Sequence, residues 1–375
     1  MFNRHDISIN ECQLEGALAS LGFDWWWHSF SAKDAETGEH KSFFIGFYLC
    51  NPALGREKPV LGQTKANKRS NTKPSYLMIK AGTWGADAAQ VHRFFGCKKV
   101  DMCYTRPFQI SAGDCFLTED ATHGSVKVSK EDAGYYKEWM SQPGEMSWSL
   151  VMDKQLAFNI GPGSGKLMRK LQAYQGFWHV EGMRTAYSGE VTWNGRRYIV
   201  TPEDSYGYAD KNWGREFTSP LIRLSSSDLR SEITGRKLED TAFVMLGGTP
   251  KMGRIQLKRK LLTAFWYEGK EYEFNAARFL HFCRAKANCR ENRGRVIWRI
   301  EQRSLKDRIV ANMVCDKKDM LLVNFESPDG ARLHNRLWNG GNGRGTIELY
   351  RFGRLVDRMH VENLRCDWGE YRKNH

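Results

Sequence analysis

The sequence predicts a mainly β protein, organised as antiparallel barrels or sandwiches with a few short helices. Most of its 375 residues form short runs in which apolar and polar residues alternate, and Gly, Asn and Asp separate these runs. Long stretches with helical periodicity are scarce. At roughly 100–200 residues per domain, a chain of this length is expected to form two domains, here two β-rich halves of similar size.

The strand candidates are rich in aromatic and β-branched residues and alternate in polarity. The clearest are the segments 42–49, 75–81, 146–152 and 296–301. A hairpin is predicted over residues 189–200, because Asn194-Gly195 supplies the positive φ values that a type I′ turn needs. A second hairpin is predicted over residues 260–274, where the polar residues 268–270 separate two aromatic strands.

Four helices are also expected, over residues 9–21, 85–95, 129–140 and 275–284. The third has the clearest start, because Ser129 precedes acidic residues in the first turn. The crossover between the two halves is expected near residues 175–181. The chain is therefore expected to divide into an N-terminal domain, 1–178, and a C-terminal domain, 179–375.

Composition narrows the classes of function. The chain contains 13 Trp, 14 Tyr and 20 Phe, and aromatic residues commonly line apolar ligand pockets. No apolar stretch approaches the roughly 20 residues of a membrane-spanning helix, and the first residues lack a signal-peptide pattern. A cytoplasmic protein without a membrane span is expected, for which peripheral contact with a membrane surface stays open.

Metal and nucleic-acid binding are both disfavoured. The nine cysteines are scattered and form no Cys-x-x-Cys pair, so neither a structural metal nor any other cofactor is expected. The formal charge is +14, and the segment 251–375 holds 27 Lys and Arg against 15 Asp and Glu. These charges interleave with strand-like apolar residues and form no long basic run, so a solvated barrel exterior is favoured over a nucleic-acid surface. The oligomeric state cannot be read from the sequence.

One central segment carries a family resemblance. Directly after the Asn-Gly hairpin, residues 205–214 read Ser-Tyr-Gly-Tyr-Ala-Asp-Lys-Asn-Trp-Gly. This string resembles the motif of the tocopherol cyclase-like proteins, and it fits the looser pattern of the superfamily that includes carotenoid 1,2-hydratases. The motif positions are filled by Gly207, Tyr208, Asp210, Lys211, Trp213 and Gly214.

The resemblance implies two lipocalin-like barrels with an apolar ligand site and no cofactor, the motif lying in the C-terminal domain. It also implies acid chemistry at a carbon–carbon double bond, in which protonation of an alkene forms a carbocation. The N-terminal segment Trp25-Trp26-Trp27-His28 does not match the plant cyclases, so the resemblance does not supply the substrate.

Asp210 is the expected acid, because burial favours the protonated form of a carboxyl group. If the motif is a strand, Tyr208, Asp210 and Asn212 share one face, which could line a barrel interior, and Lys211 points the other way. Tyr208 is therefore a second catalytic candidate. The alternative for Asp210 is a structural role, in which it binds backbone N–H groups or pairs with Lys211.

Other residues are candidates for substrate contact or proton transfer. Aromatic rings stabilise cations through their π-faces, which points to Tyr206, Trp213, Trp25 and Trp27, although each could simply fill a core. Lys211 is expected at the substrate site as well. A histidine titrates near neutral pH, which makes His28 a catalytic candidate. His179 and Glu181 alternate in one strand and could form an acid–base pair at the site.

These features together favour a cofactor-independent isomerase or lyase that acts on a hydrophobic isoprenoid or polycyclic small molecule. Cyclisation within one molecule is the specific expectation. A hydratase or dehydratase in the same pocket is the alternative. A binding protein that holds a hydrophobic ligand without changing it is also open, since a barrel can do no more than enclose a ligand.

Overall fold

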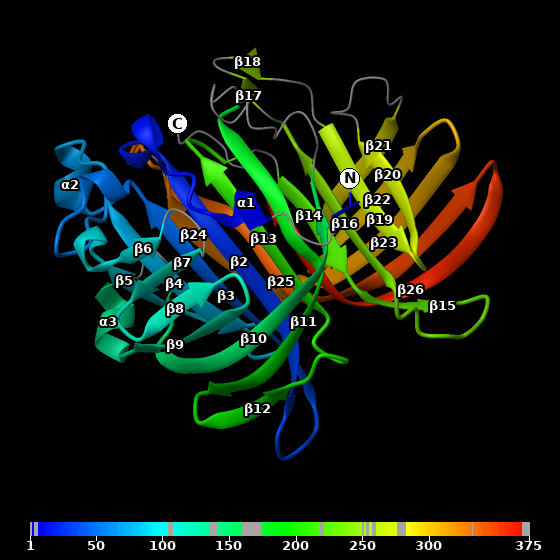
Figure 1. Cartoon of the computed structure of the whole chain (residues 1–375), viewed down its shortest axis with the longest axis horizontal. Coiled ribbons are helices and arrows are strands. Elements are labelled where there is room, and N and C mark those ends of the chain that lie inside the picture. Colours follow the sequence, from blue (N-terminus) through cyan, green and yellow to red (C-terminus); the bar gives the residue numbers. More distant parts are fainter. Residues whose placement is uncertain are drawn as a thin grey trace.

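The computed structural model describes residues 2–3, 7–103, 108–135, 141–159, 174–217, 221–249, 251–252, 255–256, 260–275, 283–331 and 333–369. Two large antiparallel sheets, one of 13 strands and one of 11, curve into barrel-like shapes and lie side by side (Figure 1). A small pair of strands, β17 (Lys251–Met252) and β18 (Ile255–Gln256), is separate from both. The predicted mainly β fold with two barrels is confirmed.

The first sheet holds the strands of the N-terminal part of the chain. Its main path runs β5-β4-β3-β2-β12-β11-β10-β9-β8-β7-β6; β1 pairs with β10, and β13 pairs with both β11 and β2. The strands are β1 (Phe2–Asn3), β2 (Phe23–Asp34), β3 (His40–Cys50), β4 (Tyr76–Thr83), β5 (Ala89–Phe95), β6 (Asp101–Cys103), β7 (Gln109–Ala112), β8 (Cys115–Thr118), β9 (Ala121–Val128), β10 (Gly144–Phe158), β11 (Gly176–Trp193), β12 (Arg196–Val200) and β13 (Gly207–Gly214).

The second sheet follows the order β20-β19-β16-β14-β26-β25-β23-β22-β21, with β15 on β26 and β24 on β25. Its strands are β14 (Leu221–Ser226), β15 (Asp228–Ser231), β16 (Thr241–Gly248), β19 (Lys260–Tyr267), β20 (Lys270–Asn275), β21 (Arg284–Asn292), β22 (Arg295–Arg303), β23 (Asp307–Asp316), β24 (Leu321–Glu326), β25 (Leu333–Arg351) and β26 (Arg354–Gly369).

The sheets change between Gly214 and Leu221. The expected domain division after residue 178 falls inside β11, which pairs with β10, β12 and β13 of the first sheet. A division of the chain into two domains therefore stays a prediction, with the sheet boundary as its natural place.

The predicted strands and hairpins agree with the structure. All four strand segments lie in the observed strands β3, β4, β10 and β22. At the first hairpin turn Asn194 and Gly195 have φ values of 48° and 83°, and at the second Glu268 and Gly269 have 42° and 81°. Turn chemistry is local, so the sequence was sufficient to locate these turns.

Two of the four predicted helices are wrong. Residues 85–95 contain the strand β5, whose apolar residues look helical because both faces of the strand are buried: Val91 faces the first barrel, whereas Phe94 packs between the sheets. Residues 9–21 contain only the end of α1 (Ile7–Asn10) and a 3₁₀ turn (Gly16–Ala19). The carbonyl oxygen of Asn10 instead accepts hydrogen bonds from the first barrel.

The third predicted helix begins as expected and forms α3 (Lys130–Tyr135), where Ser129 Oγ accepts from the Asp132 backbone N–H at 3.0 Å. Its predicted remainder lies outside the described residues, as do residues 276–282 of the fourth. The other short helical elements are α2 (Lys65–Arg69), Pro52–Leu54, Cys97–Lys99 and Lys317–Asp319.

Apolar side chains gather in three large layers. One fills the first barrel, one fills the second, and a third lies between the two sheets. Strand β2 serves two of these layers, because alternate residues of a strand point to opposite faces. Trp26 packs in the first barrel, and Trp25 and Trp27 pack between the sheets. The layer between the sheets, here called the inter-sheet layer, holds the candidate site.

Candidate active site

Strand β13 alternates as the sequence predicted. Tyr208 belongs to the inter-sheet layer, and Asp210 points the same way, toward Trp178 of β11 and Arg223 of β14. Lys211 points to the opposite face and into the first barrel. The face that carries Asp210 therefore lines the space between the barrels and not a barrel interior, because β13 sits where the two sheets meet.

Asp210 is fully buried and bound through one oxygen. Its Oδ2 accepts from Trp178 Nε1 at 2.8 Å, from the Tyr208 hydroxyl at 2.9 Å and from Arg223 Nη1 at 2.8 Å. Its Oδ1 is buried and has no hydrogen-bond partner among the described residues. Three donors, one of them a guanidinium, suit an ionised carboxylate.

Arg223 joins Asp210 to a second buried aspartate. Its Nη2 lies 2.8 Å from Asp367 Oδ2 on β26, and Asn339 Nδ2 donates to the other oxygen of Asp367. Burial lowers the pKa of Arg223, but the charges of Asp210 and Asp367 outweigh it and hold that pKa above its usual value. Asp210, Arg223 and Asp367 form a row across the two sheets, here called the carboxylate pair with its arginine.

The two carboxyl groups differ in their surroundings. Burial raises the pKa of Asp367; the Arg223 guanidinium and Asn339 counteract this, and the charge of Asp210 adds to it. When two carboxyl groups share a site, the one with the raised pKa is the better proton donor. Asp367, whose pKa is raised, is therefore the candidate acid, and Arg223 links it to Asp210.

A small cavity adjoins the carboxylate pair. It has a volume of about 30 Å³ and is lined by Trp25, Trp27, Trp178, Arg223 and Asp367, among others. The Trp25 and Trp27 rings meet edge to face, 5.6 Å apart. The volume is enough for one or two water molecules, so a larger apolar ligand would have to displace side chains or part the sheets.

Gly46 on β3 makes room for these indoles. A Cβ atom at this position would lie 2.9 Å from Trp25 Nε1 and 3.0 Å from the Trp27 ring, which is too close for either ring to stay in place. Trp27 in turn lies under the Arg223 guanidinium, 5.8 Å from its ring centre. The strand backbone thus lies directly against an aromatic wall of the cavity.

A buried amine belongs to the same layer. Lys80 on β4 is 1% exposed, and its Nζ has no hydrogen-bond partner in the part of the chain that the structure describes. Burial lowers the pKa of Lys80 from 10.5 to about 7, although the charge of Asp367 acts to raise it. Nothing in the sequence pattern pointed to Lys80, because a single lysine in a strand usually marks a solvated edge.

Replacing Lys80 with Met is expected to raise the free energy of unfolding, and more at pH 6 than at pH 10. The folded protein releases the Lys80 proton near pH 7 and the unfolded chain near 10.5, so this group makes wild-type stability rise between those values. The variant lacks this rise. The amount by which its free energy of unfolding exceeds that of the wild type should therefore shrink by about 2–4 kcal/mol from pH 6 to 10. Urea unfolding of both proteins at both pH values measures this difference. A difference that does not change with pH would contradict the lowered pKa of Lys80.

Several residues predicted for the site lie elsewhere. Lys211 pairs with Asp24 at 3.0 Å, both fully buried, and its ammonium lies 4.5 Å from the Trp26 ring centre. Trp213 stacks on Phe177 at 5.5 Å in a small separate cluster. The alternative in which Lys211 pairs with Asp210 is therefore wrong.

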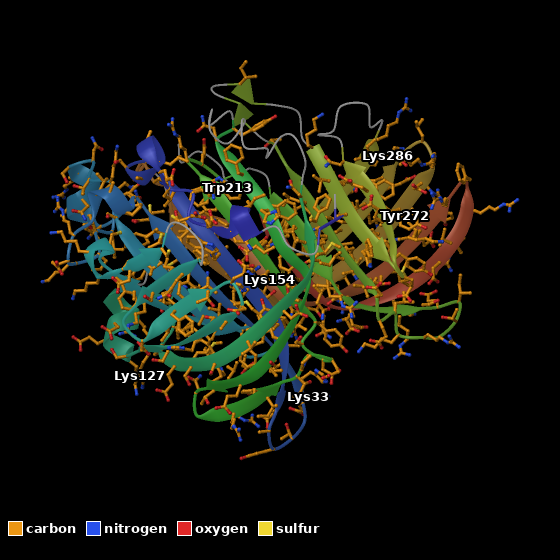
Figure 2. All side chains as sticks on the ribbon, viewed as in Figure 1. Lys33, Lys127, Lys154, Trp213, Tyr272 and Lys286 are labelled. Atoms are coloured by element: carbon orange, nitrogen blue, oxygen red, sulfur yellow. The ribbon has the colours of Figure 1, made fainter. Side chains whose placement is uncertain are left out.

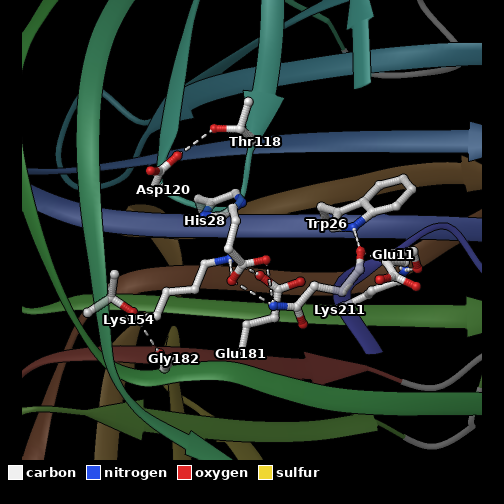
Figure 3. A network of polar contacts seen from close by, with 12 residues as sticks. Glu11, Trp26, His28, Thr118, Asp120, Lys154, Glu181, Gly182 and Lys211 are labelled. Atoms are coloured by element: carbon white, nitrogen blue, oxygen red, sulfur yellow. Dashed lines mark hydrogen bonds and ion pairs between the residues drawn. The ribbon is translucent and has the colours of Figure 1, made fainter. Parts of the chain in front are cut away.

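His28 and Glu181 also point into the first barrel, as Figure 3 shows. His28 Nδ1 lies 2.9 Å from the Tyr187 hydroxyl, and burial lowers the pKa of His28 well below its usual range. Glu181 pairs with Lys154 at 2.7 Å, and Lys154 pairs with Glu119 at 2.9 Å. This network ties strands together on the side of the first sheet that faces away from Asp210.

His179 is buried on the same face as Lys211, its register partner. Tyr206 lies before β13 in a groove of about 240 Å³, where Lys237 sits 4.9 Å from its ring centre. Of the ten predicted site residues, the structure brings four together at the inter-sheet layer: Asp210, Tyr208, Trp25 and Trp27.

Two findings bear on metals and membranes. The described residues contain no group of three or more His, Cys, Asp or Glu side chains placed to hold a metal ion. Within the same ranges, no helix has the length and apolar character needed to cross a membrane.

Comparison with known proteins supports the fold. No family model and no curated protein matches the sequence. The solved structure of CghA with Sch210972 has a TM-score of 0.50 at 11% identity, covering 95% of this chain and 90% of that one. An AttH-type protein of Nitrosomonas europaea gives 0.46 at 11% identity, covering 95% of both chains. Kievitone hydratase of Nectria haematococca gives 0.47 at 9% identity, covering 97% of this chain and 92% of that one.

At these identities the likeness to CghA concerns the two-barrel architecture alone. The resemblance to the tocopherol cyclase-like proteins stays a prediction.

Proposed function

We propose that the protein is a cofactor-independent isomerase or lyase that protonates a carbon–carbon double bond of a hydrophobic isoprenoid or polycyclic molecule. The reaction takes place between the two sheets. The observation that supports this most is the carboxylate pair with its arginine, which is buried beside three indole rings. A buried acid, a dry surrounding and aromatic faces are what a carbocation reaction requires.

Asp367 is the proposed acid. Its proton moves to one alkene carbon, forming a C–H bond and leaving a carbocation on the neighbouring carbon. The Asp367 and Asp210 carboxylates then face the cation from the two sheets, and the indoles of Trp25 and Trp27 offer it their π-faces. In a cyclisation, a group of the same molecule captures the cation and releases its proton to Asp210, and this proton returns to Asp367 before the next turnover.

The role of Asp210 differs from the one expected from the sequence. Tyr208, Trp178 and Arg223 all donate to one of its oxygens, and this suits a fixed negative charge. Its other oxygen has no partner in the described ranges and is free to accept a proton from the cation. Asp210 is therefore proposed as base and electrostatic partner.

A hydratase or dehydratase uses the same residues, with water capturing the cation or leaving before it forms. A substrate bound in this cavity of about 30 Å³ would leave little space for water, which favours capture within one molecule. A binding protein that does no chemistry remains the alternative in a different class.

Mass spectrometry of apolar cell extracts separates these functions. The extracts are incubated with the wild-type protein, with Asp367→Asn and with Asp210→Asn. A compound that changes retention at constant mass with wild type alone indicates an isomerase, and a mass change of one water indicates a hydratase or dehydratase. Retention of one unchanged lipid by all three proteins would refute the catalytic proposal in favour of ligand binding.

A further inference from the structure

Lys80 has the surroundings of a reactive amine. It follows Tyr76 and Met78 on the face of β4 that belongs to the inter-sheet layer. Its Nζ lies 5.9 Å from the centre of the Phe44 ring and has no acceptor among the described residues. Buried ammonium groups are normally paired, so an unpaired one is unusual for a purely structural residue.

His92 stands beside Lys80 on the next strand. The two residues are register partners in β4 and β5, and side chains of such pairs share a face and lie close together. Neither ring nitrogen of His92 has a hydrogen-bond partner in the described part of the chain. Burial, and then the charge of Lys80, lower the pKa of His92 well below its usual range, so its imidazole is neutral. A neutral imidazole has one donor and one acceptor nitrogen, and it can relay a proton without becoming charged.

Lys80 lies near the indole-lined cavity. It is the register partner of Gly46, the residue over which the Trp25 and Trp27 rings lie. From the other sheet, the Asp367 carboxylate, which lines the cavity, acts on the charge of Lys80. A ligand that enters between the sheets and displaces side chains around the cavity would therefore come close to the amine.

We propose that Lys80 is a nucleophile that captures the aldehyde or ketone group of a hydrophobic ligand as an imine. The amine nitrogen attacks the carbonyl carbon and forms a C–N bond, and one proton moves from nitrogen to oxygen through His92. The resulting hydroxyl leaves as water when the second amine proton is transferred to it, and a C=N bond forms. Hydrolysis reverses the sequence, so no oxidant or reductant is needed.

The charges around Lys80 are consistent with a neutral amine at physiological pH. His92 on β5 is neutral, and Phe44 on β3 offers only a ring face. Among the described residues, Asp367 on β26 is the carboxylate whose charge acts on Lys80, and Asp367 is paired with Arg223 on β14. Desolvation is how proteins commonly activate a lysine for carbonyl chemistry.

The test is reductive trapping with geranial, an unsaturated isoprenoid aldehyde. The full-length protein is incubated at pH 7 with geranial and sodium cyanoborohydride, and modified lysines are mapped by peptide mass spectrometry. Lys127 and Lys286, which are exposed on the outer surface, serve as internal references (Figure 2). Lys80 is expected to react at least about tenfold faster, because half of its amines are unprotonated at pH 7, against roughly one in a thousand for an ordinary lysine.

Variants complete the test. Lys80→Arg cannot form an imine and should lose the fast modification while Lys127 and Lys286 react as before. His92→Phe should slow modification of Lys80 without changing the references. Modification of Lys127 and Lys286 with Lys80 left untouched would overturn the proposal.

Imine formation at Lys80 would take place near the cavity of the proposed alkene reaction, but it does not depend on that reaction. If Lys80 is trapped quickly but the protein alters no double bond, the imine proposal is supported and the proposed alkene reaction is refuted. If turnover is lost in Asp367→Asn and Lys80 is not trapped, the alkene reaction is supported and the imine proposal is refuted.

Discussion

Asp367→Asn is expected to lower kcat by about 10²–10⁴-fold, the usual effect of removing a general acid. The amide oxygen of asparagine can keep the contact to Arg223, but its NH₂ group cannot accept from Asn339 and cannot supply the proton that starts the reaction. Substrate affinity should change little, because asparagine has nearly the same size and shape as the aspartate that it replaces in the cavity wall. Product formation by wild type and variant, followed by chromatography with mass detection, measures the effect.

Two further variants control for the loss of a buried carboxylate. Asp357→Asn removes a buried aspartate of β26 that binds Ser231 and Tyr267 outside the cavity, and its activity should remain within about twofold of wild type. Asp210→Asn should impair turnover less than Asp367→Asn, because it leaves the acid in place. If Asp210→Asn is the more damaging change, the two carboxyl roles are reversed.

Arg223→Met is expected to destabilise the protein by about 3–5 kcal/mol, the usual effect of breaking a buried ion pair. Arg223 is bound at 2.8 Å by both Asp210 and Asp367, and its loss leaves two carboxylates facing each other between the sheets. Burial without a partner then favours protonation of at least one of them, so the loss of stability should be smaller at low pH. Denaturant unfolding at pH 5 and pH 8 measures both effects.

An exposed arginine gives the matched control. Arg354 lies at the start of β26 and is exposed, so Arg354→Met should change stability by no more than about 0.5 kcal/mol. Adding Asp210→Asn and Asp367→Asn to Arg223→Met should restore part of the lost stability, because no buried charge is then left unpaired. A triple variant less stable than Arg223→Met would contradict this electrostatic explanation.

Local features of the fold could be read from the sequence. The turn at Asn194-Gly195 and the two faces of β13 were both predicted, because turn chemistry and strand alternation depend on a few neighbouring residues. The helix predicted over residues 85–95 is wrong because that prediction also relied on the local pattern of apolar residues. Strand β5 is buried on both faces, and its apolar residues lose the alternation that marks a strand.

The site itself depends on contacts that alternation cannot reveal. The pattern of β13 places Tyr208 and Asp210 on one face, but it does not say whether that face meets a barrel interior or another sheet. Arg223 and Asp367 come from strands of the second sheet and reach Asp210 only when the barrels pack together. Asp367 is one of several charged residues of β26, and other residues of that strand are exposed, so the sequence pattern does not single it out.

Residues near the motif were misplaced for a related reason. Lys211 and Trp213 follow Asp210 closely in sequence, but odd and even positions of a strand face opposite ways. His179 on β11 and His28 on β2 belong, with Lys211, to the face that points into the first barrel. Closeness in sequence therefore selected residues from both sides of one sheet.

The most direct test of the central claim is to run the reaction in D₂O. If a carboxyl group between the sheets protonates the double bond, the wild-type product should carry one deuterium at a single former alkene carbon, and Asp367→Asn should form almost none of it. A product that forms at the wild-type rate without deuterium would contradict protonation of the double bond and with it the proposed role of Asp367.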